Sequence, residues 1–222
     1  MKASRIVATL LAVVAMAALP ATAEAATTVA RWPLAGNAND STGHGHNGAA
    51  QNVDFTTVPG WAGFNGSNSR IAVPYSAALS PGAADVTATV TVSTTATPGT
   101  SNFDFDLMRA SPTGKMYKIE LFPHGSIKAQ AQCIFIGTST RINVHAGPSL
   151  NDGKPHVIVC KKTTNQVTLT VDGKQVGSAN VTIGSINLKQ NAVFALGYKP
   201  VPAGTDADFY NGLLQNAEVD IG

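Results

Sequence analysis

The sequence predicts an all-β protein whose strands form two packed antiparallel sheets, a jelly-roll sandwich. Short segments alternate apolar and polar side chains with turn signals between them, as half-buried strands do. No long stretch shows helical periodicity. Regularly spaced short strands are typical of a sandwich or jelly roll rather than of a sheet built from βαβ units.

The alternation is clearest in four segments, which we expect to be strands. They are residues 86–92, 116–122, 157–160 and 167–171. Asp172-Gly173 follows the last segment directly, and this dipeptide between two apolar runs predicts a β-hairpin. The chain has no repeat of fixed period and no Pro- or Ser-rich linker, so a single domain is expected.

Residues 1–25 have the organisation of a secretory signal peptide. A positive head precedes an apolar run over residues 6–19, and small residues follow at Ala23 and Ala25. The apolar run is shorter than the roughly 20 residues that a membrane-spanning helix needs, and no later segment is long and apolar enough to span a membrane. We expect cleavage after Ala25, or alternatively after Ala23, and an extracellular protein.

The mature chain, residues 26–222, is nearly neutral. It carries 13 basic and 12 acidic side chains, with no basic run beyond Lys161-Lys162, so neither nucleic acid nor an anionic membrane is an expected partner. Thr, Ser, Asn and Gly fill a surface with few charges. Such a surface suits an uncharged polar partner, and we expect an extracellular glycan or cell-surface polymer. A domain of this size needs no oligomer to hold its core, so a monomer is expected.

The two cysteines, Cys133 and Cys160, are expected to form a disulfide. Exported chains fold in an oxidising compartment, where two thiols usually pair. A free catalytic thiol is the alternative.

Four parts of the mature chain carry motifs that belong together. They are Trp32-Pro33-Leu34 with the Gly-rich turn Asn39-Asp40-Ser41-Thr42-Gly43-His44-Gly45-His46-Asn47-Gly48, Gly63-Phe64-Asn65-Gly66-Ser67 with Ile71-Ala72-Val73-Pro74, Leu150-Asn151-Asp152-Gly153-Lys154-Pro155-His156-Val157 with Thr168-Leu169-Thr170-Val171-Asp172-Gly173, and Phe209-Tyr210-Asn211-Gly212-Leu213-Leu214-Gln215-Asn216-Ala217-Glu218-Val219. In this order they resemble the laminin G-like branch of the concanavalin A-like lectin/glucanase superfamily. The resemblance implies a concanavalin A-like jelly roll over residues 26–222.

Two positions depart from the family's pattern. Pro155 stands where the family usually has Trp, and Asn216 stands near the place of an Asp in the closing strand. The resemblance does not imply one function, because the fold carries lectins, adhesion modules, glycosidases and lyases.

The acidic residues do not match the glycosidase branch of the superfamily. Those enzymes place Glu-x-Asp-x-Glu on one strand, whereas the mature chain has only two glutamates, Glu120 and Glu218. Lys118 and Phe122 share the strand face of Glu120, so this glutamate has no acidic partner on its own strand.

Asp104 and Asp106 are the alternative acidic pair. Alternation places both on one face of a strand, and we expect them to face water while Phe103, Phe105 and Leu107 face the core. No catalytic residue is therefore assigned, and the protein is not expected to be an enzyme.

The resemblance also implies that calcium can bind at the rim of the sandwich. Asp40 in the opening turn, Asn216 in the closing strand, and Asp206 and Asp208 in the preceding loop would supply the oxygen ligands that calcium prefers. The alternative for Asp40 is a turn cap formed with its own backbone. His44-Gly45-His46 is a further metal candidate, for which a solvated turn is the simpler interpretation.

Three aromatic residues are expected at a ligand. Tyr198 and Tyr210 bracket the loop of residues 200–208, and Trp61 follows a Pro-Gly turn. Sugar rings pack on aromatic faces as other apolar surfaces do. The alternative is that these rings pack in the core.

Together these observations predict a secreted, non-catalytic binding module for carbohydrate or adhesion, with calcium as an optional ligand. One alternative is a glycan-cleaving enzyme of the same fold, a glycosidase or a lyase. The other is a structural, protein-binding envelope domain, which an exposed apolar patch would indicate.

Overall fold

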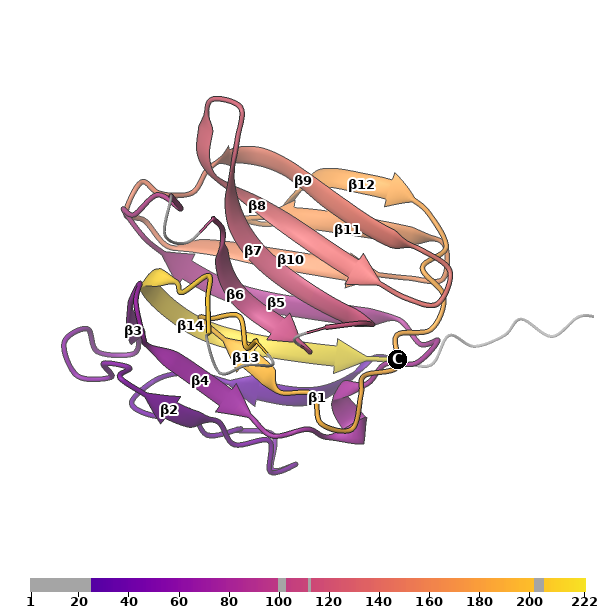
Figure 1. Ribbon diagram of the computed structural model, residues 1–222, viewed down its shortest axis with the longest axis horizontal. Helices are drawn as coiled ribbons and strands as arrows, with labels where there is room; N and C mark the ends of the chain where they lie inside the picture. The colour runs from indigo at the N-terminus through magenta and orange to yellow at the C-terminus, as the bar shows by residue number, and fades with distance from the viewer. Residues whose placement is uncertain (1–24, 100–102, 112, 202–205) are drawn as a thin grey trace, which may run out of the picture.

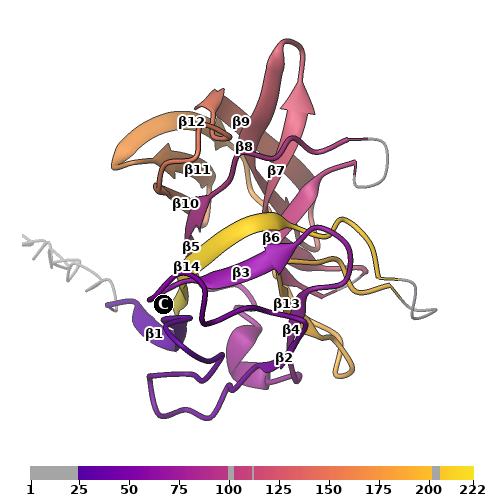
Figure 2. The same cartoon turned by 90° about the vertical axis from the view of Figure 1, so that its left-hand side faces the viewer.

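In the computed structural model, the described part of the chain forms a sandwich of two antiparallel β-sheets with one short 3₁₀ helix (Figures 1 and 2). The structure describes residues 25–99, 103–111, 113–201 and 206–222. The two sheets confirm the predicted all-β class. The expected signal peptide lies, apart from Ala25, outside the described residues. No helix in the described part of the chain has the length and apolar character needed to cross a bilayer.

The first sheet has the closing strand second from one edge. Its order is β1 (Thr27–Trp32), β14 (Asn211–Ile221), β5 (Val86–Ser93), β10 (His156–Lys162), β11 (Gln166–Val171) and β12 (Lys174–Asn180), and β3 (Ala62–Asn65) also pairs with β14. β14 pairs with β3 through its first half and with β1 through its second half, so two short strands share one edge of a long one.

The second sheet ends in three long strands that are joined by two hairpins. Its order is β2 (Ala49–Gln51), β4 (Arg70–Val73), β13 (Phe194–Leu196), β6 (Phe105–Ala110), β7 (Met116–His124), β8 (Ile127–Ile136) and β9 (Arg141–Ser149). Every strand pair in both sheets is antiparallel. The 3₁₀ helix η1 (Ala77–Leu79) follows β4.

The four segments predicted as strands all lie in strands, namely β5, β7, β10 and β11. The predicted hairpin is also present, since β11 pairs with β12 across Asp172-Gly173. Both turn residues have positive φ, 51° and 75°. This conformation matches the twist of the flanking strands and favours Asp followed by Gly.

Alternate side chains of both sheets fill the space between them. In β5, β7, β8 and β11 the inward residues are fully or almost fully buried, as the two-residue period of a strand requires. Trp32 of β1 stacks on Phe194 of β13 with ring centroids 5.1 Å apart. This contact joins the two sheets near one end of the core.

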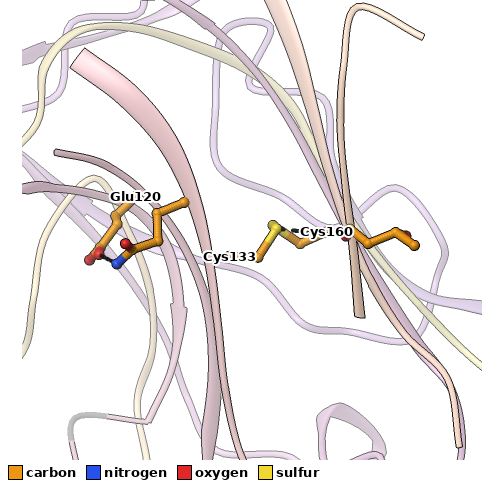
Figure 3. Close-up of a disulfide and its surroundings, with 5 residues drawn as sticks. Glu120, Cys133 and Cys160 are labelled. Atoms are coloured by element: carbon orange, nitrogen blue, oxygen red, sulfur yellow. Dashed lines mark hydrogen bonds between the residues drawn. A yellow bond between two sulfur atoms is a disulfide. The ribbon is translucent and has the colours of Figure 1, made fainter. Parts of the chain in front are cut away.

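A disulfide joins the two sheets at the other end of the core, as predicted. Cys133 of β8 and Cys160 of β10 have Cα atoms 5.6 Å apart, and both side chains are fully buried. Figure 3 shows that Glu120 lies on the opposite face of the second sheet from this bond. The two faces of β7 and β8 therefore differ: the inner face carries the disulfide and packs in the core, and the outer face carries polar groups.

Replacing both cysteines, C133A/C160A, is expected to lower the free energy of unfolding by about 3.5 kcal/mol, because the bond removes loop entropy from the unfolded chain. The closed loop has a sequence separation of 27. Urea unfolding of the double variant and of the parent, with and without reductant, measures the effect. Equal stability of variant and parent would contradict a stabilising role for the bond.

Candidate functional site

The outer face of the second sheet, which points away from the core, carries rows of polar side chains that cross four strands. Cross-strand pairing aligns Asp106 of β6, Glu120 of β7, Gln132 of β8 and His145 of β9 in one row. The next row contains Arg109, Lys118, Ile134 and Asn143. Directly paired side chains on one face lie about 4.5–5.5 Å apart at their Cβ atoms. The sheet therefore assembles one polar surface from four segments.

A β-bulge in β6 puts Asp106 and Arg109 on the same face. The two residues are three positions apart, and strict alternation would point them to opposite faces. The pairing of β6 with β7 shifts between Asp106 and Met108. The extra residue of this bulge turns the side chains of Asp106 and Arg109 to the same face of the sheet. As a result, Leu107 and Met108 are both fully buried, while Asp106 and Arg109 share one network.

Lys118 is at the centre of this network. Its Nζ donates to Asp106 Oδ1 at 2.8 Å, forms an ion pair with Glu120 Oε2, and lies 3.8 Å from Asp104 Oδ2. Arg109 Nη1 donates to Asp106 Oδ2 at 3.0 Å. Gln132 Nε2 donates to Glu120 Oε1. These contacts hold the side chains of three strands in fixed positions.

Burial changes the protonation of the network. It raises the pKa of Glu120 to about 8, against the opposing effect of Lys118 and together with the charges of Asp104 and Asp106. Burial likewise raises the pKa of Asp104 to about 6, which Lys118 opposes and Asp106 reinforces. Burial lowers the pKa of Lys118, but Asp106, Glu120 and Asp104 together raise it further, so the net shift is upward. Lys118 therefore stays charged at neutral pH.

The network forms one side of a pocket of about 380 Å³ on this face, which we call the outer-face pocket. Apolar side chains line its other parts. The lining residues are Phe103, Asp104, Arg109, Met116, Lys118, Glu120, Phe122, Gln132, Ile134, Ile136, Arg141, Asn143 and Lys199. The pocket thus combines hydrogen-bonding groups with an aromatic and aliphatic surface, as ligand sites do.

The structure corrects the expectation for Asp104 and Asp106. Both belong to the outer-face network, but they do not face water: Asp106 is 0% exposed and Asp104 is largely buried. Phe103 does not face the core, since it is 78% exposed at the pocket. Glu120 has no acidic partner on its own strand, as expected, but β6 supplies one from the neighbouring strand. Strand register, which the sequence pattern does not contain, decided this outcome.

Asp40 forms the turn cap that was the alternative to a calcium ligand. Its carboxylate accepts hydrogen bonds from the backbone amides of Arg31, Thr42 and His46 and from the Thr42 hydroxyl. Burial raises the pKa of Asp40, but these hydrogen bonds lower it by more. The carboxylate oxygens are therefore engaged by the turn itself.

The other three residues expected at calcium make contacts of their own, none of which is with Asp40. Asp206 pairs with Arg70, and Asp208 pairs with Lys199 at 2.6 Å. Asn216 is exposed at the bulge of β14, where its backbone amide donates to Pro33. In the described part of the chain, only Asp104, Asp106 and Glu120 group three carboxylates with ligand atoms within 4.8 Å of one another, and Lys118 already lies among them. Calcium binding by Asp40, Asn216, Asp206 and Asp208 stays a prediction.

The three aromatic residues expected at a ligand have different surroundings. Tyr210 is 0% exposed and its hydroxyl donates to Ser93 O at 3.0 Å, so it belongs to the core. Tyr198 is also buried, with its ring stacked on Phe209 at 6.4 Å. Trp61 is half-buried in the loop before β3. None of them lines the outer-face pocket, whose aromatic residues are Phe103 and Phe122.

The histidines lie outside the pocket lining. His156 contacts Asp172 at 2.7 Å and Asp152 at 3.0 Å through its two ring nitrogens, which fits the structural role expected at the hairpin corner. His46 is buried in the opening turn rather than solvated, because its backbone carbonyl accepts from Trp32 Nε1 and draws the turn onto the core.

Comparison with known families gives one match. A laminin G-type family model described as Concanavalin A-like lectin/glucanases superfamily matches residues 65–219. None of the curated proteins compared matches the chain in sequence.

Several solved structures share the fold. Domain 4 of AbnA, a GH43 extracellular arabinanase from Geobacillus stearothermophilus solved in complex with arabinotriose, is 17% identical with a TM-score of 0.61, and the match covers 90% of this chain and 94% of that one. Domains LG4-5 of the mouse laminin alpha1 chain are 19% identical with a TM-score of 0.54, over 72% of this chain and 40% of that one. The botulinum neurotoxin serotype D binding domain is 11% identical with a TM-score of 0.62, and the match covers 86% of this chain and 47% of that one. The match thus spans less than half of the laminin and neurotoxin chains.

The raised pKa values make stability depend on pH. The folded state holds a proton on Glu120 up to a pH of about 8, whereas the unfolded chain releases it near 4.5. The corresponding stability is present below the unfolded pKa and is lost as pH rises through the folded one. The free energy of unfolding should therefore fall between about pH 4.5 and pH 8, by at most roughly 1.4 kcal/mol per pH unit for one proton. E120Q should reduce this slope.

Chemical denaturation of the parent and of E120Q at several pH values measures the slope. E218Q is the matched control, because the pKa of Glu218 is lowered, chiefly by its hydrogen bond with Arg31; this variant should keep the fall in stability. Identical slopes in the parent and E120Q would contradict protonation of Glu120 in the folded state.

Proposed function

The chain belongs to the Concanavalin A-like lectin/glucanases superfamily, and we propose that it is an extracellular, non-catalytic module that binds carbohydrate in the outer-face pocket. The observation that carries the proposal is the combination of groups in that pocket. Rigid donors and acceptors from β6, β7 and β8 lie beside Phe122, Ile134 and Met116. A sugar presents hydroxyls on its edge and C–H groups on its faces, and it needs both kinds of surface.

The size and rigidity of the pocket support this proposal. Its volume of about 380 Å³ falls in the range of small-molecule sites, roughly 300–1,000 Å³. The side chains of Glu120 and Lys118 are held by their contact with each other and by the ion pair of Lys118 with Asp106 before any ligand arrives, so little side-chain freedom is lost on binding. Preorganised polar groups also fix the orientation of a ligand.

The fold comparisons agree with a binding role. Domain 4 of the arabinanase was solved with arabinotriose, and the neurotoxin structures are of binding domains. The disulfide between β8 and β10 suits an extracellular protein, because such bonds persist in oxidising compartments. The described residues expose only two large hydrophobic side chains, Phe103 and Val157, one beside each sheet. This pattern gives no support to a protein-binding apolar patch.

A second candidate function is cleavage of a glycosidic bond in the same pocket. Carboxyl oxygens of Asp104 and Glu120 lie within 4.8 Å of each other, and retaining glycosidases separate their two carboxyl groups by about 5–5.5 Å. A pKa of about 8 keeps Glu120 protonated at neutral pH, while a pKa of about 6 leaves Asp104 mostly ionised. Such a difference suits an acid and a nucleophile. The contacts of Lys118 with both carboxyl groups argue for binding instead.

Release of reducing ends from polysaccharides distinguishes the two functions. We expect none from the parent. Release by the parent that falls at least 100-fold in E120Q would replace the binding proposal with hydrolysis. D152N, which changes an exposed carboxylate at the hairpin corner, is the control and should leave any release unchanged.

Binding itself is tested with a glycan array followed by titration calorimetry on the best ligand. F122A removes an aromatic surface of the pocket and should weaken binding roughly 5- to 10-fold, as expected for about 1 kcal/mol of ring contact. V157A, at an exposed residue of β10, should not change the affinity. Absence of binding across a broad array of neutral and acidic glycans would overturn the proposed function.

A further inference from the structure

One cation at the outer-face pocket is left out of the ion network. Arg141 begins β9, is exposed, and pairs across the sheet with Ile136 of β8. Its Nε donates to Asn143 Oδ1 at 3.2 Å, and it forms no ion pair with any described residue. Residues 100–102, 112 and 202–205, which the structure does not describe, include no Asp or Glu.

The other three cations of the pocket already have carboxylate partners. Arg109 and Lys118 pair with Asp106, and Lys199 pairs with Asp208. Lys118 also lies beside Asp104 and Glu120, so these three cations are already surrounded by carboxyl groups. Arg141 is therefore the cation of the pocket that has no carboxylate partner among the described residues, and it can attract an anionic group of a ligand.

The chemistry of Arg141 suits a carboxylate. A guanidinium has five donors in a planar arrangement that matches the two oxygens of a carboxylate. The contact with Asn143 uses Nε and leaves the two terminal nitrogens, which can bind both oxygens at once. Ile136 and Met116 lie in the same cross-strand row as Arg141. Apolar surface for a sugar ring and a donor pair for its acid group are thus adjacent.

We propose that the outer-face pocket selects a sugar that carries a carboxylate, a uronic acid, and that Arg141 binds that carboxylate. This inference rests on the proposed function and names its ligand class. It differs from the uncharged ligand that the composition of the surface favours. The hydroxyls of the same sugar then form hydrogen bonds with Glu120 and Gln132. Its ring lies against the apolar side chains between this row and Arg141.

A sulfated sugar is the competing anionic ligand. Densely sulfated chains gain affinity from several unpaired cations at once. Around this pocket, Arg141 is the cation without a carboxylate partner among the described residues, and Asp104 and Glu120 lie nearby. One free guanidinium matches one carboxylate per sugar better than it matches a run of sulfates.

The test compares each acidic oligosaccharide with its own neutral ester. Oligomers of galacturonate, glucuronate and mannuronate, their methyl esters, neutral arabinan oligomers and dextran sulfate are titrated calorimetrically at low and physiological salt. The parent should bind at least one free acid ten-fold or more tightly than its methyl ester. R141A should abolish that difference, and R141K should restore part of it, because lysine keeps the charge without the planar donor pair.

K161A is the matched control, because Lys161 is an exposed cation on β10 of the other sheet; it should leave acid and ester binding unchanged. The thermal unfolding midpoint of each variant confirms that it is folded. Equal binding of acid and ester by the parent overturns the inference and leaves the proposed function intact. Tighter binding of dextran sulfate than of any uronate, or a preference for acid that survives in R141A, also overturns it. Failure to bind any glycan overturns both.

Discussion

The filling of the space between the two sheets constrains every other feature of this molecule. Each strand of the sandwich commits every second side chain to that space. In β7, Tyr117, Ile119 and Leu121 point inward and are fully buried. Their neighbours Lys118 and Glu120 must then point outward, where the adjacent strands decide their contacts. The polar face of the second sheet therefore follows from the packing of its apolar face.

The outward groups are nonetheless largely buried, and this has an energetic consequence. Buried charges are costly unless they are paired and hydrogen-bonded. Lys118 meets this requirement through Asp106 and Glu120, and Arg109 meets it through Asp106 and the carbonyl of Ser111. The bulge in β6 is essential, because without it Arg109 would point into the core. A local irregularity of one residue thus makes a balanced network possible.

The same fold carries binding domains and enzymes, so the fold alone does not decide the function. The proposed function rests instead on how the charges of the pocket are partnered. Lys118 contacts both Asp104 and Glu120. In a retaining glycosidase these two carboxyl groups would have to be available, one for proton transfer and one for attack on the sugar. Arg141, which also lines the pocket, has no carboxylate partner among the described residues. These differences favour recognition of a ligand over chemistry on it.

The sequence by itself determined the class of fold, four of the strands, the β11–β12 hairpin and the disulfide, because alternation, turn dipeptides and cysteine pairing are local or compositional signals. It also placed Lys118, Glu120 and Phe122 on one face of one strand. Only the tertiary structure decided that Asp106 lies opposite Glu120, that Phe103 leaves the core, and that Tyr210 enters it. The physical reason is that register and bulges join residues from distant segments, and no local pattern records which strands become neighbours.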